Sequence, residues 1–343
     1  MEGFQLVADN LESKLGYCGN LGVFMDRHTK TVYHYCSNET FMSILSNLTL
    51  RVTNIKKSND YTEIVNCLDL FQRSLRIACY RFNKTNPEDS EFAQFYHEAD
   101  IATLVERSIM NDTLTYYAVC FSEAGDSLSQ WRGYADNATG VAIGFDRQYL
   151  DKATDRQNMK FMEVEYNKQN VEEDLVNYVV NKFEQVKKDL GVFVTTTHYG
   201  NAISQVLTSF VYNAAFYKNA AFAEEKELRL VFYPFGNIQN LYIRHQARDM
   251  SSNQLYYDRM FEYLQKERQY GPFIRKPLSF GLRRNNIFSY FDLDFSSIAP
   301  FFVQEIVLGP KNNMDDLDLR LFLLSKGFDV ANIKIIRSTA TYQ

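Results

Sequence analysis

Two acidic residues in the second half of the chain could act together in catalysis. Glu225 and Glu227 are separated by one residue and precede or begin an apolar segment, residues 227–233 (ELRLVFY). If this region is a β-strand, both carboxylates lie on one face, because side chains alternate along a strand. Two like charges held close together raise the pKa of one of them, which suits an acid–base pair. Arg229 continues the alternation, and an internal ion pair with these acids is its plainest role.

A histidine in another predicted strand is the second candidate. His34 lies in residues 31–36 (TVYHYC), beside Tyr35. An imidazole on a rigid strand can bind ribose hydroxyls and orient a nucleotide. Trp131 and Tyr134, spaced i and i+3 on a short predicted helix, could stack on an aromatic ring, as could Tyr35. All of these residues could instead be structural, with His34 a satisfied strand histidine and the aromatic residues core anchors.

Polar residues at the ends of predicted elements could bind a substrate. Ser37 follows the first strand, and Ser122 ends a buried strand. Asn59, Asp60 and Glu63 form a polar loop, in which Asp60 and Glu63 have the spacing of a helix capping box. Each of these residues also has a structural interpretation, as a helix cap or as the end of a strand.

Apolar periodicity predicts the elements that position these residues. Strands are expected at about residues 31–36, 48–52, 115–122, 140–145, 161–166, 227–233, 279–291, 303–308 and 333–338, and helices at about 37–48, 60–75, 90–111, 129–134, 171–190, 203–221, 253–268 and 315–326. Helices come in blocks and strands in runs, which favours an α+β fold with a mixed, mainly antiparallel central sheet and helical insertions. We expect a single domain over residues 1–343, with a core at about 31–145 and 224–343 and a helical insertion at about 167–223.

Composition limits the class of protein. Hydrophobic residues make up 45% of the 343 positions and charged residues 23%, which is typical of a folded globular chain. Five widely spaced cysteines without a CxxC pair indicate reduced core residues in a cytoplasmic protein. The first residues lack the features of a signal peptide, and no apolar run is long enough to span a membrane. The histidines are far apart in sequence, so no metal is expected.

Charge argues against a nucleic-acid partner. The net charge is −5, which disfavours broad affinity for a polyanion. Basic and aromatic residues are interleaved between 259 and 284, so this segment could form a face for phosphates, or simply a solvated surface. The chain contains no P-loop, dinucleotide-binding glycine motif or nucleophile elbow, which excludes the classes of protein that those motifs define.

Several segments together resemble a bacterial family known as domain of unknown function 2971. They are residues 33–45 (YHYCSNETFMSIL), 59–63 (NDYTE), 120–145 (CFSEAGDSLSQWRGYADNATGVAIGF), 224–232 (EEKELRLVF), 303–310 (VQEIVLGP) and 336–342 (IRSTATY). They are spread over most of the chain and keep the order of the family. This resemblance implies a shared fold and a set of polar residues, but no particular reaction.

A more distant similarity is to ADP-ribosyltransferases that carry a histidine on their first core strand. It implies that His34 matches this histidine, that Glu225 or Glu227 matches the later glutamate, and that Tyr35, Trp131 or Tyr134 covers the nicotinamide. The glutamate would stabilise a cation-like ribose centre. The similarity therefore implies an NAD-using transferase that binds NAD or another nucleotide-like small molecule, in stress or phage defence, with an acceptor that the sequence does not specify.

Two other classes of function stay open. A Mg²⁺-dependent nuclease could use Glu224 and Lys226, which have ExK spacing, with Asp60 as a further acid. A non-enzymatic ligand-sensing or protein-binding module is the other alternative, and the 27 Phe and 23 Tyr residues could line a homo-oligomer interface as well as a core. The geometric test of the transferase hypothesis is whether His34 and Glu225 or Glu227 converge in one pocket.

Overall fold

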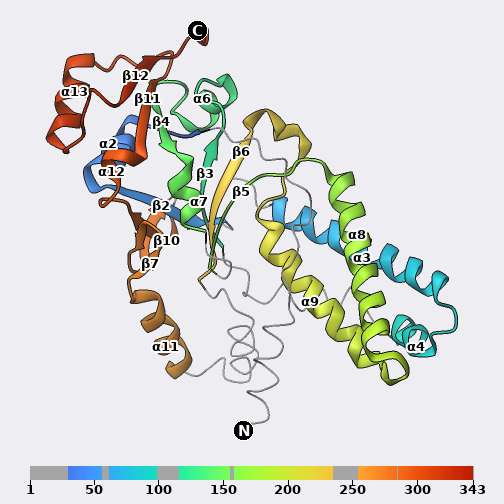
Figure 1. Cartoon of the computed structure of the whole chain (residues 1–343). Helices are drawn as coiled ribbons and strands as arrows, with labels where there is room; N and C mark the ends of the chain where they lie inside the picture. Colours follow the sequence, from blue (N-terminus) through green and yellow to red (C-terminus); the bar gives the residue numbers. More distant parts are fainter. Residues whose placement is uncertain are drawn as a thin grey trace. The chain divides into compact units, whose positions relative to one another are not determined.

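The computed structural model describes residues 30–55, 62–98, 116–154, 158–234, 254–283 and 285–342 (Figure 1). The chain divides into two units. A helical unit comprises Met1–Arg27, Val65–Met110 and Asn167–Ala214, and a sheet-containing unit comprises His28–Ile64, Asn111–Tyr166 and Ala215–Gln343. The sequence placed 167–214 in a helical insertion, but it grouped 65–110 with the core.

The helical unit is built around aromatic side chains. Its helices are α3 (Thr62–Thr85, which begins in the other unit), α4 (Ser90–Glu98), α8 (Lys168–Leu190) and α9 (Thr196–Ala214). The ring centroids of Phe82 and Phe92 are 4.5 Å apart, and those of Phe92 and Tyr199 are 4.9 Å apart. Edge-to-face pairs of this kind stabilise a core beyond the apolar area that they bury. A helix was predicted from the sequence at each of these four places, and the one predicted at 90–111 is described only as far as Glu98.

Twelve strands of the second unit form one sheet. They are β1 (Thr31–Cys36), β2 (Thr49–Asn54), β3 (Tyr117–Ser122), β4 (Val141–Asp146), β5 (Met159–Glu163), β6 (Glu227–Phe232), β7 (Arg268–Tyr270), β8 (Phe273–Arg275), β9 (Ser279–Arg283), β10 (Asn286–Asp294), β11 (Val303–Leu308) and β12 (Lys334–Arg337). The main path runs β12-β11-β4-β1-β3-β2-β10-β8-β7, with β6 and β5 branching from β3 and with β9 on β10. The pair β11–β12 is parallel and the other described pairs are antiparallel, which confirms the predicted α+β class.

The sheet branches at β3. One edge of β3 pairs with β6 over its whole length, from Tyr117 to Ser122. The other edge pairs with β1 at Ser122 and with β2 at Tyr117 and Ala118. Between these points β1 leaves toward β4 while β2 leaves toward β10, and helix α2 (Asn38–Asn47) connects the two. The middle of β3 therefore faces the opening between two diverging strands.

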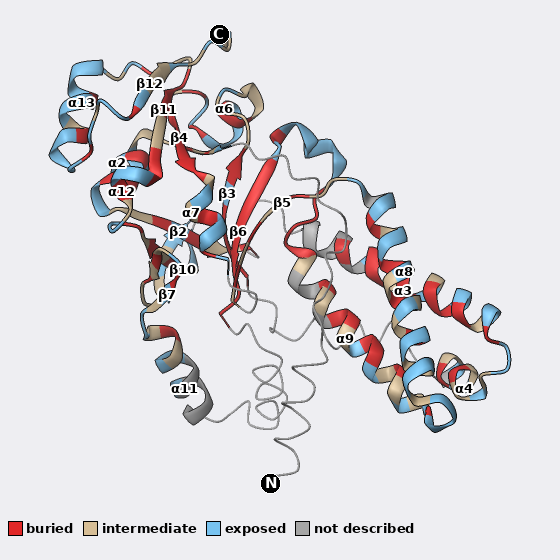
Figure 2. Ribbon diagram, in the orientation of Figure 1, coloured by how far each residue is buried: buried red, intermediate tan, exposed pale blue. Residues whose placement is uncertain are grey.

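The core of this unit lies on one face of the branching sheet. Buried apolar residues of β1, β3, β4 and β6 join those of β2 and β10 in one cluster, and Figure 2 shows that the buried residues follow these strands. The remaining helices of the unit are α6 (Leu128–Tyr134), α7 (Arg147–Lys152), α11 (Gln254–Gln265), α12 (Ala299–Phe302) and α13 (Asp316–Ser325). Of the helices in the described ranges, none is both long and apolar enough to cross a membrane.

Two of the predicted helices end earlier than the sequence indicated. The helix predicted at 203–221 ends at Ala214, because Tyr217 pairs with Glu165 in an extended segment before the short 3-10 helix η3 (Ala220–Glu225). The predicted helix 253–268 ends at Gln265, and a hairpin, β7–β8, follows it. Gly271 supports this turn, with a φ of +53° that favours glycine.

The basic segment 259–284 is not one solvated face. Arg275 is 1% exposed, and its guanidinium donates to the carbonyl oxygens of Leu264 at 3.0 Å and of Lys266. It also lies 4.7 Å from the ring centroid of Phe291. The sequence reading was wrong for this residue, which joins the end of α11 to the sheet and is not available to a phosphate.

The cysteines among the described residues follow the prediction with one exception, and Cys18 lies outside the described residues. Cys36, Cys67 and Cys79 are buried and form no disulfide, as expected for reduced core residues. Cys120 is also free, but it is exposed. It lies in the middle of β3, opposite Arg229 of β6.

Candidate functional site

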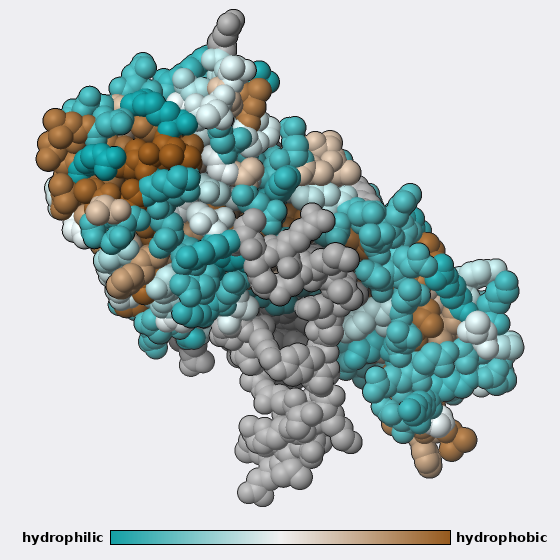
Figure 3. Space-filling view, turned by 45° about the horizontal axis from the view of Figure 1, so that its top comes forward, coloured by the Kyte–Doolittle hydropathy of each residue, from teal (hydrophilic) through white to brown (hydrophobic). Residues whose placement is uncertain are grey.

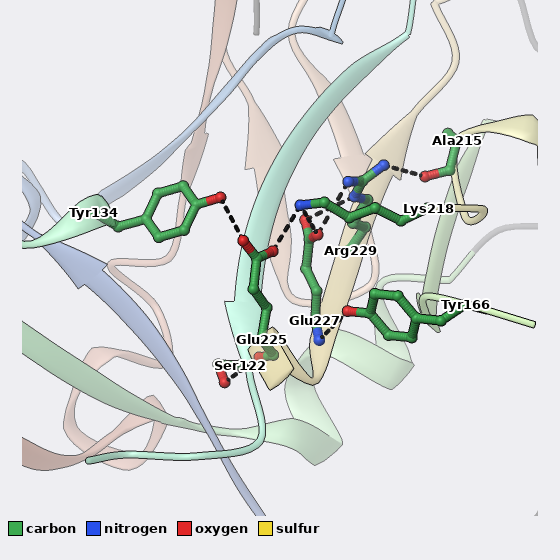
Figure 4. Close-up of polar contacts among 8 residues, drawn as sticks. All are labelled: Ser122, Tyr134, Tyr166, Ala215, Lys218, Glu225, Glu227 and Arg229. Atoms are coloured by element: carbon green, nitrogen blue, oxygen red, sulfur yellow. Dashed lines mark hydrogen bonds and ion pairs between the residues drawn. The ribbon is translucent and has the colours of Figure 1, made fainter. Parts of the chain in front are cut away.

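Four buried charged side chains cluster at the start of β6 (Figure 4). Lys218 Nζ lies 2.6 Å from a carboxylate oxygen of Glu225 and 3.1 Å from one of Glu227. Arg229 donates to both oxygens of Glu227, at 2.7 and 3.0 Å. Each of the four residues is at most 7% exposed. We call this group the charge cluster, and its two acids and two bases balance.

The backbone before β6 brings the two acids together. Lys226 has a φ of +45° and ends η3, so the chain turns sharply between Glu225 and Glu227. Glu225 therefore belongs to η3 and not to the strand, contrary to the prediction that strand alternation aligns both acids. The carboxylates still meet, because both reach the ammonium group of Lys218.

Neighbouring groups satisfy the remaining polar atoms of the charge cluster. Tyr134 of α6 donates its hydroxyl proton to Glu225 at 3.2 Å, and Ser122 donates to the backbone oxygen of Glu225 at 2.7 Å. The backbone N–H of Glu227 donates to the hydroxyl of Tyr166 at 2.9 Å. Ser122 ends β3 and holds the backbone of Glu225, whereas Tyr134, which is 45% exposed, connects the charge cluster to the surface.

The electrostatics of the charge cluster do not fit an acid–base pair. Burial alone would raise the pKa of Glu227, but the adjacent Arg229 and Lys218 outweigh it and lower the pKa to about 2. Burial alone would lower the pKa of Lys218, but Glu227 and Glu225 raise it. Both groups therefore stay charged at neutral pH, and the predicted internal ion pair of Arg229 is present.

His34 lies at the branch of the sheet. Its Nδ1 is 2.8 Å from the carbonyl oxygen of Cys120, in the opening between β1 and β2. A carbonyl can only accept, so Nδ1 carries the proton and Nε2 keeps its lone pair. Burial lowers the pKa of His34, which keeps the ring neutral. The side chain is half-buried, and within the described ranges Nε2 has no hydrogen-bond partner.

The structure does not bring His34 and the glutamates together. Ser122 is paired with Tyr33 of β1 and with Glu227 of β6, so these three side chains share one face of the sheet. His34 follows Tyr33 and points to the other face, where its ring centroid lies 6.0 Å from that of Phe121 in the apolar core. The proposed carboxylate and imidazole thus project from opposite faces.

The aromatic residues predicted to cover a nicotinamide are core residues, with the exception of Tyr134. Trp131 is fully buried and Tyr35 is 6% exposed, and their ring centroids are 4.7 Å apart at a steep angle. Trp131 Nε1 donates to Asp126 at 2.7 Å, and the Tyr35 hydroxyl donates to the carbonyl oxygen of Ala124 at 2.7 Å. Neither ring offers a free face to a ligand.

The other residues predicted to bind a substrate have structural roles or lie outside the residues that the structure describes. Ser37 caps α2, since its hydroxyl accepts the N–H of Thr40 at 3.2 Å. Asn59 and Asp60 lie outside the described residues, and Glu63 lies in the first turn of α3, where its side chain is not described.

The nuclease alternative gains no support from the described residues. In the part of the chain that the structure covers, no three or more His, Cys, Asp or Glu side chains are grouped to hold a metal ion. Lys226 serves instead as the left-handed residue that ends η3, and Glu224 is exposed beside it. Asp60, the further acid of this hypothesis, is not described.

Sequence reasoning missed three residues of the site. Lys218 was predicted to lie inside a helix, and nothing in its surroundings signals that it pairs with acids seven and nine positions later. Tyr166 contributes through its hydroxyl, and Asp126 anchors Trp131. The only signal for Asp126 was its place in the segment 120–145 that carried the family resemblance.

The fold and site define an α+β protein with a branched sheet and a buried charge cluster. Residues 130–230 match the model of the family described as protein of unknown function (DUF2971). This part of the chain is therefore similar to that family, as the resemblance of the sequence indicated. The matched segment contains the charge cluster and Tyr134, but not His34. Searches found no match among curated proteins and none among solved structures.

Proposed function

We propose that this chain is a ligand-sensing protein that binds NAD or a related nucleotide through His34. The observation that carries the proposal is the neutral imidazole at the branch of the sheet, fixed through Nδ1 and with Nε2 left as an acceptor. A ligand hydroxyl, such as that of a ribose, is a donor that matches this acceptor. Because the Cys120 carbonyl already holds the ring in place, ordering it costs little on binding.

The geometry favours binding over NAD cleavage. Cleavage by the predicted mechanism needs a carboxylate beside the ribose that His34 binds. The carboxylate of Glu227 lies on the opposite face and accepts from Arg229 and Lys218. We therefore propose that the charge cluster stabilises the start of β6 and that His34 binds the ligand.

The substitution His34→Asn tests the binding role. The side-chain amide of asparagine can replace Nδ1–H as a donor to Cys120, but it has no acceptor at the position of Nε2. We expect NAD⁺ to raise the melting temperature of the wild-type chain, and we expect the variant to bind NAD⁺ about tenfold more weakly, the effect of about one lost hydrogen bond. Calorimetric titration with NAD⁺ measures both affinities.

His97→Asn is the matched control, because His97 is exposed on α4 and far along the chain from the branch. It should bind NAD⁺ as the wild type does. If the wild-type chain binds neither NAD⁺ nor ADP-ribose nor AMP, or if His34→Asn binds as well as the control, the proposal is wrong. If the wild-type chain releases nicotinamide from NAD⁺ and Glu227→Gln does not, the transferase hypothesis is supported instead.

A further inference from the structure

Strand β9 is an edge strand with exposed apolar side chains. Among the described residues it pairs only with β10, in a register without a bulge. Phe280 and Leu282 are 56% and 71% exposed and lie on one face of the strand, and Ile287 of β10, which is 69% exposed, lies beside Leu282 on the same face. The strand contains no proline. It therefore lacks two features, a bulge and a proline, that protect sheet edges from pairing with another strand.

The outer edge of β9 exposes the backbone groups of Phe280 and Leu282. Asp292 of β10 accepts the N–H of Lys276 at 2.8 Å, across the edge of β10 that also faces β9. Every second residue of β10 bonds across this edge. The residues of β9 that are paired with them are Ser279, Gly281 and Arg283. The N–H and C=O groups of Phe280 and Leu282 point the other way, and within the part of the chain that the structure describes they have no hydrogen-bond partner.

These unpaired backbone groups indicate what covers β9. Figure 3 shows apolar side chains gathered over α13 as well, but a helix bonds its backbone groups internally and so specifies no particular partner. The unpaired groups of an edge strand are satisfied by another extended strand, which continues the sheet. We therefore expect a strand at this edge.

The sequence of β9 fits a second copy of the same strand. In an antiparallel pair centred on Gly281, Phe280 of each copy faces Leu282 of the other. These are the residues whose backbone groups point outward, so the pair gains about four hydrogen bonds. A pair centred on Phe280 would place Leu282 opposite Leu278, whose backbone groups are already bonded to α11. The register centred on Gly281 is therefore favoured over it.

Side chains and charges are compatible with this register. The residue that faces itself at the centre is Gly281, which has no side chain to clash with its copy. Phe280 and Leu282 form apolar pairs across the two strands, which bury part of their exposed surface. Arg283 is the one charged residue of β9 and faces Ser279 of the other copy, so no like charges are directly opposed.

We propose that β9 is the interface of a two-fold symmetric dimer of this chain, in which two β9 strands pair antiparallel about Gly281 and join the two sheets. A two-fold interface uses the same patch on both subunits, so it requires a self-complementary surface. Strand β9 meets this requirement in its unpaired backbone groups, its apolar side chains and its charge. This inference is independent of the ligand proposed for His34.

Disulfide trapping tests the register. Ser279 of one copy and Arg283 of the other form a pair without hydrogen bonds, in which the Cα atoms lie about 4.5 Å apart, within reach of a disulfide. A mixture of Ser279→Cys and Arg283→Cys should oxidise in air to a covalent dimer of about 80 kDa, twice the 40.0 kDa of the chain. Either variant alone should not, because position 279 faces 283 and not itself. Both variants carry Cys120→Ser, which removes an exposed thiol.

Leu282→Pro tests the role of the backbone. Proline removes the outward N–H of Leu282 but no hydrogen bond to β10, and edge strands tolerate it at such positions. Sedimentation velocity at several concentrations should show a dissociation constant raised about tenfold or more, since each copy loses a hydrogen bond. Ile287→Pro is the matched control, because Ile287 is paired with Leu282 in the same hairpin and its N–H points away from β9. It should dimerise as the wild type does.

A mixture of the cysteine variants that gives no covalent dimer would overturn the proposal, and so would a wild-type chain that stays monomeric at every concentration. A dimer that Ile287→Pro weakens as much as Leu282→Pro does would also contradict it. The register is wrong if the covalent dimer forms equally well in either cysteine variant alone.

Discussion

At the scale of single residues, neighbours along a strand were easier to predict than contacts made through turns. Arg229 and Glu227 are two positions apart on one strand, so their ion pair follows from alternation alone. Lys218 reaches the same carboxylate because α9 ends at Ala214 and Lys226 reverses the chain. Periodicity does not encode such a reversal, and a non-glycine residue at positive φ has no reliable sequence signal.

The charge cluster should contribute to stability rather than to catalysis. Glu227→Gln removes one anion and leaves Lys218 and Arg229 with a single carboxylate between them. Removal of one partner from a buried ion pair typically costs about 3–5 kcal/mol, and we expect a loss of that size in the free energy of unfolding. Denaturant unfolding measures it, and Glu224→Gln, a change at the exposed neighbour, should have little effect.

The pKa of Glu227 predicts how the free energy of unfolding changes with pH. The pKa of Glu227 is about 2 in the folded chain, below its usual value of about 4.3. Its contribution is therefore complete above the unfolded pKa and is lost as the pH falls toward 2. The stability of Glu227→Gln should consequently depend less on pH in this acidic range, and an equal slope for both proteins would contradict the assignment.

At the scale of elements, one aspartate ties α6 to the end of the chain. Asp126 accepts from Trp131 Nε1 at 2.7 Å and from the backbone N–H of Thr339 at 2.8 Å, and the hydroxyl of Ser338 donates to it. These contacts hold the segment after β12 against the loop before α6. The contacts with Ser338 and Thr339 join residues more than two hundred positions apart in the chain.

Removal of this anchor should loosen both elements. Asp126→Ala leaves the buried Trp131 Nε1 without its acceptor, a defect that costs about 1–3 kcal/mol. Trp131 is the sole tryptophan, so its fluorescence reports directly on this site during unfolding. Asp174→Ala, a change at an exposed residue of α8, is the control. Equal stability of Asp126→Ala and the control would show that the anchor contributes nothing.

At the scale of the whole molecule, the sequence predicted the class of fold but not the faces of the sheet. Strands such as β1 and β11 have the predicted boundaries, because alternation and apolar runs are local signals. The face on which each side chain lies depends on the register between strands, and a shift of one residue reverses it. His34 and Glu227 could be placed on their strands, but their opposite orientation follows only from the pairing of β1, β3 and β6.

The branch of the sheet explains why His34 differs from an ordinary core histidine. Its side chain lies on the face of the sheet that carries the apolar core, at the point where β1 and β2 diverge from β3. The carbonyl of Cys120, which lies 86 positions away, fixes its ring. Sequence periodicity does not predict a contact that exists only because two strands separate. The sequence therefore indicated His34 as a candidate binding residue, but it could not show that Nδ1 is bound and Nε2 is left as an acceptor.

Nitrogen NMR of the histidine side chains tests this assignment most directly, with His34→Asn identifying the signals. We predict a neutral ring at neutral pH with a protonated Nδ1 and an unprotonated Nε2, and a shift of the Nε2 signal when NAD⁺ is added. A proton on Nε2 in the free protein, or an Nε2 signal that does not move at saturating NAD⁺, would contradict the ligand-sensing role of His34.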